Sequence, residues 1–76
     1  MHVEVICWRG VEMWYNSKHK SAASVLDAVE EALLLKKRGH YTRIELMDLV
    51  NDSGHHDVTT LMQARQLLAA FEGRPP

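Results

Sequence analysis

Two stretches near the N-terminus have the composition of β-strands. Residues 2–8 (HVEVICW) and residues 11–16 (VEMWYN) are rich in β-branched and aromatic side chains, which favour strands. Gly10 lies between them and readily adopts the positive φ that a tight turn needs. The pattern therefore predicts an antiparallel hairpin with Arg9 and Gly10 in its loop.

This hairpin would carry apolar side chains on both faces. A two-residue loop places Trp8 opposite Val11 and Val5 opposite Trp14. One face then holds Ile6, Trp8, Val11, Met13 and Tyr15, and the other holds Val3, Val5, Cys7 and Trp14. Apolar residues on both faces predict that the first strand is central in its sheet and covered on both sides.

A helix is predicted over residues 22–38. Ser21 can cap the free amide groups at its start, and Ser24 with Asp27 is a second candidate start that resembles a capping box. Gly39 suits the position just beyond its end. Its apolar residues recur at helical spacing: Val25, Leu26, Val29, Ala32 and Leu33.

Residues 41–50 fit two structures. Thr42 followed by Glu45 has the form of a helix capping box, whereas Ile44 and its neighbours suit a strand. The run NDSG at 51–54 is a strong turn signal. We favour a strand, because a lone hairpin is marginal in water and a third strand would help to bury the apolar helix.

A second helix is predicted over residues 58–72. Asp57, Thr59 or Thr60 can cap its start, and Gln63 follows Thr60 by three residues. Together the elements predict an α+β fold in one compact domain, residues 1–76, with the order ββαβα. Its sheet has three antiparallel strands in the order 2-1-3, and both helices pack mainly on one face. If 41–50 were helical, the fold would instead be a β-hairpin followed by three helices.

The composition is that of a small folded domain. Of the 76 residues, 46% are hydrophobic and 25% are charged, and the formal net charge is −1, which excludes a disordered chain. The single cysteine, Cys7, excludes an intramolecular disulfide, and no apolar stretch approaches the ~18–20 residues of a membrane span. Because Met1–Glu4 lacks the pattern of a secretory signal, we expect a cytoplasmic protein that makes no membrane contact.

Size and local charge point toward association. In domains below roughly 70–80 residues, one hydrophobic core seldom contributes more than ~3–5 kcal/mol to the stability of the fold. We therefore expect a homodimer or a bound partner. The small net charge also conceals two neighbouring segments of opposite sign. The basic one has Lys36, Lys37, Arg38 and Arg43, giving +4, and the acidic one has Glu45, Asp48, Asp52 and Asp57, giving −4.

The residue types that carry catalysis or bind metals form no convincing pattern. His55, His56, Asp57 and Cys7 are the obvious metal ligands, but adjacent histidines diverge on a strand or a helix, so we expect no metal and no cofactor. Cys7 lies mid-strand, where a thiol is usually buried and inert. A chain this small also has little room for a substrate pocket, and we therefore predict that the protein is not an enzyme.

The unusual feature is an aromatic hairpin. Trp8, Arg9, Trp14 and Tyr15 lie close together in sequence, and Trp, Tyr and Arg are the residue types enriched at interface hot spots. The sequence therefore predicts a protein-interaction module, with Lys36, Lys37 and Arg38 as an electrostatic rim. We expect a regulator or inhibitor that occludes a surface on a larger protein, as small proteins from phages or mobile elements do.

Nucleic-acid binding is the alternative. Lys18, Lys20, Lys36, Lys37, Arg38 and Arg43 could contact phosphates, and hairpin aromatics could stack on bases. The isoelectric point of about 6.5 argues against it, because dedicated binders often exceed 9.

Overall fold

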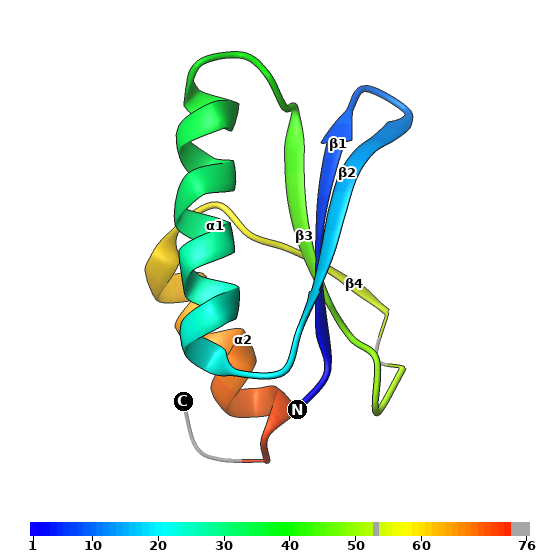
Figure 1. Ribbon diagram of the computed structural model, residues 1–76, viewed down its shortest axis with the longest axis vertical. Coiled ribbons are helices and arrows are strands. Elements are labelled where there is room, and N and C mark those ends of the chain that lie inside the picture. The colour runs from blue at the N-terminus through cyan, green and yellow to red at the C-terminus, as the bar shows by residue number, and fades with distance from the viewer. Residues whose placement is uncertain (53, 74–76) are drawn as a thin grey trace.

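The computed structural model describes residues 1–52 and 54–73, and its elements follow in the order ββαββα (Figure 1). They are β1 (Val3–Arg9), β2 (Glu12–His19), α1 (Ala22–Lys37), β3 (Arg43–Asp48), β4 (His55–Asp57) and α2 (Leu61–Phe71). The strands form one antiparallel sheet in the order β2-β1-β3-β4, and both helices cover the same face of it. The predicted α+β class and one-sided helix packing are confirmed. Because residues 43–48 form β3, the alternative of a hairpin followed by three helices is wrong.

A fourth strand extends the predicted three-stranded sheet. β4 pairs with β3 so that His55 lies opposite Met47 and Asp57 opposite Glu45. The amide of Val58 continues this ladder by donating to the carbonyl of Ile44 at 2.9 Å. Two histidines and an aspartate carry no strand signal of their own, so this strand depends on the hydrogen-bonding edge that β3 offers.

The hairpin register differs from the predicted one. Its two-residue loop is Gly10 and Val11, with Arg9 opposite Glu12, and Gly10 has a φ of 61°. Glycine at the first loop position with positive φ is the requirement of a type II′ turn, which lets Arg9 remain in β1. The predicted pairing of Trp8 with Val11 is therefore wrong.

A β-bulge changes the pairing a second time. Trp8 lies opposite Met13, whereas the preceding Cys7 lies opposite Tyr15, so Trp14 is an extra residue on β2. Val5 consequently faces Ser17 rather than Trp14. The bulge also places Trp8 and Tyr15 on opposite faces of the sheet, so the prediction that they share one face is wrong.

The hydrophobic core lies between the helices and one face of the sheet. Its buried residues come from β1, α1, β3, α2 and the segment after β4: Val3, Val5, Cys7, Val25, Val29, Ala32, Ile44, Leu46, Val58, Ala64 and Leu68. β1 is central, as predicted, but helices cover only one of its faces. On the helix-free face Ile6 is still only 2% exposed, between its cross-strand neighbours Asn16 and Glu45.

The first helix begins at the predicted cap Ser21, and the second begins at Thr60, one of the three caps predicted for it. The hydroxyl of Ser21 accepts the amide of Ser24 at 3.2 Å, and that of Thr60 accepts the amide of Gln63 at 3.1 Å. Gly39 follows the end of α1 with a φ of 87°. The second helix starts three residues later than predicted, because the backbone at 58 is still paired with β3.

Candidate protein-interaction site

β2 is a long edge strand with outward-facing backbone groups. The amide of Leu49 donates to the carbonyl of His2 at 2.9 Å, so even-numbered residues of β1 turn their backbone toward β3. Ile6 is one of these, and its partner on β2, Asn16, therefore turns its own amide and carbonyl away from β1. Lys18 has the same orientation as Asn16. β2 pairs only with β1 within the described residues, and these outward groups are available to another strand.

Four exposed hydrophobic side chains lie on and beside this edge strand, and we call them the hairpin surface. Val11 is 96% exposed, Met13 54%, Trp14 52% and Tyr15 56%. The predicted site residues Trp14 and Tyr15 belong to this surface. The sequence predicts a sheet face for Val11 and Met13 and does not include them in the site, and their exposure follows from the shifted loop and register.

Arg9 fixes the orientation of Trp14. Its guanidinium carbon lies 3.9 Å from the centre of a Trp14 ring, and its Nε donates to the carbonyl of His40 at 3.0 Å. A cation–π contact at an exposed site contributes about 0.5–1 kcal/mol. Arg9 therefore presents the indole in a defined position, which lowers the entropy lost when a partner binds it.

Trp8 has a different environment from Trp14. It lies on the helix-free face, where its Nε1 donates to Glu45 Oε1 at 2.5 Å and the Arg43 guanidinium lies 4.8 Å from its ring centre. The side chain is half-buried. Because its indole N–H is already bonded within the protein, Trp8 supports the sheet beside the hairpin surface.

A buried carboxylate organises that face of the sheet. Glu45 is only 8% exposed and lies 3.2 Å from Arg43 Nε and 3.0 Å from His55 Nδ1. Arg43 also lies 3.9 Å from Asp57 on β4. The charge of Arg43 is thus partnered inside the fold. Nothing in the sequence marks Glu45 as buried, since the strand β4 that covers it was not predicted.

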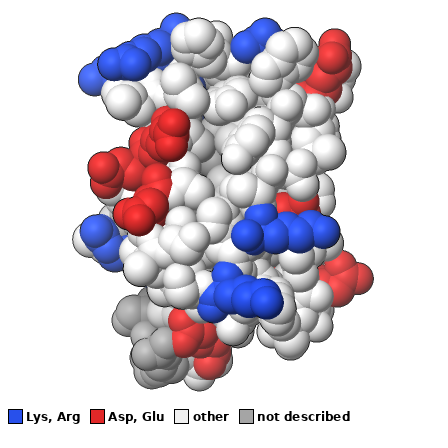
Figure 2. Space-filling view, viewed as in Figure 1, with Lys and Arg blue, Asp and Glu red and all other residues white. Residues whose placement is uncertain are grey.

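The remaining basic residues do not form one patch. Lys36 and Lys37 lie in the last turn of α1 and Arg38 caps it, whereas Lys18 and Lys20 lie near the junction that leads into its first turn. A 16-residue helix spans about 24 Å, which separates the two groups. In Figure 2, the Lys and Arg side chains on the visible side of the molecule, shown in blue, lie in separate places with uncharged surface between them.

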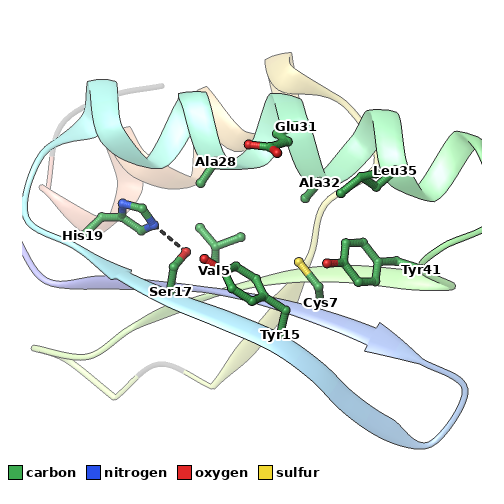
Figure 3. Close-up of a pocket in the computed structure, with 10 residues that line it drawn as sticks. All are labelled: Val5, Cys7, Tyr15, Ser17, His19, Ala28, Glu31, Ala32, Leu35 and Tyr41. Carbon is green, nitrogen blue, oxygen red and sulfur yellow. Dashed lines mark hydrogen bonds between the residues drawn. The ribbon is translucent and has the colours of Figure 1, made fainter.

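A groove of about 360 Å³ opens between β2 and α1 (Figure 3). Its apolar lining includes Val5 and Leu35, and its β2 wall includes Tyr15, Ser17 and His19. The His19 ring bridges two hydroxyls, with Nε2 2.6 Å from Ser17 Oγ and Nδ1 2.6 Å from Ser24 Oγ. This bridge ties the end of β2 to the first turn of α1 and holds the groove wall in place.

Burial raises the pKa of the Cys7 thiol to about 11, although Cys7 lines the same groove. A thiol with this pKa stays protonated at neutral pH and is a poor nucleophile. The pKa of the Tyr41 phenol is raised as well, mainly because burial disfavours its charged form. The groove therefore offers neutral hydroxyl and thiol groups beside the carboxyl group of Glu31, which also lines it.

The candidate metal ligands lie apart. His55 contacts Glu45 on the helix-free face, whereas His56 packs against Phe71 with ring centres 5.4 Å apart, and Cys7 lies in the core. Across residues 1–52 and 54–73 there is no group of three or more His, Cys, Asp or Glu that could hold a metal ion.

Comparisons with protein families, with curated proteins and with solved structures each find no match. Among the residues described, no helix is both long enough and apolar enough to span a membrane. The surfaces of the chain itself therefore carry the functional proposal.

Proposed function

We propose that the protein is a small protein-interaction module that regulates or inhibits a larger protein by covering part of its surface. The observation that carries this proposal is the hairpin surface, four hydrophobic side chains in the loop and edge strand of the hairpin that are each more than half exposed. Trp, Tyr and Arg dominate interface hot spots, and Trp14, Tyr15 and Arg9 lie together here. Burying such side chains against a partner contributes a favourable free energy of about 25 cal/mol per Å² of apolar area removed from water.

The mode of binding that we propose is strand addition. An extended segment of a partner can hydrogen-bond to the outward amide and carbonyl groups of Asn16 and Lys18. Alternate side chains of that segment would point toward the groove between β2 and α1, beside Tyr15 and Ser17. The backbone would then supply affinity, and the groove and hairpin surface would supply specificity.

Binding rather than catalysis is supported by the state of the groove residues. The Cys7 thiol is protonated at neutral pH, and both ring nitrogens of His19 are occupied by hydroxyls.

We place the protein in the cytoplasm, where its single cysteine stays reduced, and regard proteins encoded by phages or mobile elements as its functional analogues. Nucleic-acid binding has weaker support, because Arg43 is held by Glu45 and the lysines are divided between two ends of α1.

The proposal is tested by capture with matched variants. The tagged protein, the double variant Trp14→Ala/Tyr15→Ala and the control Met62→Ala are each incubated with an extract of the organism that encodes the chain. Met62 is 60% exposed on α2, so the control removes a comparably exposed hydrophobic side chain at a different place. We expect the wild type and the control to retain the same larger protein and the double variant to lose it. Equal retention by all three would contradict the proposal.

A further inference from the structure

We propose that the edge of β2 pairs with β2 of a second copy of this chain, antiparallel and about a two-fold axis near Asn16. The two sheets would join into one continuous sheet of eight strands, twice the four that each copy contributes. This inference rests on the proposed function, because it uses the same edge as a docking site. A second copy and an extended segment of the larger protein would therefore compete for this edge.

The charges along β2 favour an antiparallel copy. Glu12 begins the strand, Lys18 lies near its end and Lys20 follows it. All three are exposed, and none forms an ion pair in the described part of the chain. An antiparallel copy brings Glu12 of each chain beside the lysines of the other, so the favourable pairing occurs twice. A parallel copy would place like charges side by side, which is unfavourable.

The backbone favours a two-fold axis at Asn16. Asn16 turns its amide and carbonyl outward, so two copies related by this axis exchange a pair of hydrogen bonds at this position. The same register places Lys18 of each copy opposite the bulged Trp14 of the other. Such an interface uses the same surface on both copies and closes at two. The outer edges that remain are the three-residue β4 strands, which are too short to promote further growth.

The groove of a second copy gives the exposed ring of Tyr15 a place to pack. In this register Tyr15 lies opposite Ser17 of the second copy, and both residues face the helix side of the sheet. Each Tyr15 ring, 56% exposed in the single chain, then covers the mouth of the other chain's groove. The dimer thus buries apolar surface twice, in a domain whose size limits what one core can contribute.

Sedimentation equilibrium on the full-length chain tests the inference. We expect a dimer whose dissociation constant rises about tenfold or more in Glu12→Lys, and also in Lys18→Glu/Lys20→Glu. The variant with all three substitutions has a lysine at 12 facing glutamates at 18 and 20 of the other copy, so opposite charges meet again. We expect this variant to recover dimerisation. Glu30→Lys is the matched control, since this exposed residue of α1 makes the same charge change away from β2 and should leave the dimer intact.

Two results would overturn the inference. One is a wild-type chain that stays monomeric over the whole concentration range, and the other is a triple variant no more dimeric than its parents. Neither result bears on capture of a larger protein through Trp14 and Tyr15. A monomer that still retains that protein removes the second copy as the occupant and leaves the proposed function standing.

Discussion

The hydrogen bond between Trp8 and Glu45 gives the sharpest test of how the helix-free face is held. Trp8→Phe removes the indole N–H and keeps an aromatic ring near Arg43. Glu45→Gln keeps an acceptor for the indole and removes the negative charge. Because Glu45 is 8% exposed and its Oε1 lies 2.5 Å from Trp8 Nε1, both changes act on a bond shielded from water.

The expected losses in the free energy of unfolding depend on whether the acceptor at position 45 is charged or neutral. A hydrogen bond to a charged group contributes about 1.5–3 kcal/mol, and one between neutral groups about 1 kcal/mol. Trp8→Phe should therefore lower the free energy of unfolding by about 2 kcal/mol in the native background and by about 1 kcal/mol in the Glu45→Gln background. The ion pair with Arg43 adds little, since that side chain is 44% exposed. The coupling energy between the two positions should be about 1 kcal/mol.

Urea unfolding followed by far-ultraviolet circular dichroism measures all four corners of this cycle without relying on tryptophan fluorescence. Trp14→Phe combined with Glu45→Gln is the control, because Trp14 is exposed on the hairpin surface and its substitution should be additive with that of Glu45. Additivity within about 0.3 kcal/mol for Trp8 and Glu45 would refute the reasoning.

Three further predictions concern single residues. Burial alone would raise the pKa of Asp48, but the side chain of Asn51 and the amides of Asn51 and Val50 donate to it, so its pKa lies below the usual value. Asp48 therefore stabilises the fold above its unfolded pKa and loses this contribution as the pH falls through the lowered folded value. In urea unfolding, Asp48→Ala should cost about 1–3 kcal/mol at pH 7 and much less in strong acid, and an equal loss at both would contradict this. Cys7, whose pKa burial raises to about 11, should react with a thiol reagent at pH 8 only as fast as the chain opens, and immediate reaction of the native protein would exclude its burial. Ser21→Ala should lower the free energy of unfolding by about 1 kcal/mol through loss of the α1 cap, and an unchanged melting temperature would argue against the cap.

Local signals in the sequence predicted most of the fold. Serine and glycine at helix ends act within one turn, so the cap at Ser21 and the end at Gly39 could be recognised without tertiary information. The choice of Thr60 over Asp57 and Thr59 could not, because it depends on the pairing of Val58 with β3. The strand at 43–48 could be favoured because Ile44 and Leu46 suit a strand and a lone hairpin needs further support.

The remaining features depend on contacts between segments distant in sequence. β4 forms because β3 offers it hydrogen bonds, and its own residues have low strand propensity. The bulge at Trp14 shifts every later pairing on β2, which a count from a two-residue loop does not detect. Trp14 and Tyr15 could be proposed as interface residues by type, but separating them from Trp8 required knowing that Trp8 lies opposite Met13 and bonds to Glu45.

The central claim is that the outer edge of β2 is the docking site, and hydrogen exchange at two amides tests it most directly. In the free chain the amides of Asn16 and Lys18 point away from β1, whereas those of Tyr15 and Ser17 point toward it. Exchange is measured by NMR for the dilute monomer and for the assembled state, with a second copy or with the captured larger protein. We predict that Asn16 and Lys18 exchange rapidly in the monomer and slowly on assembly, while Tyr15 and Ser17 are protected in both states. Rapid exchange of Asn16 and Lys18 in every assembled state would contradict the claim.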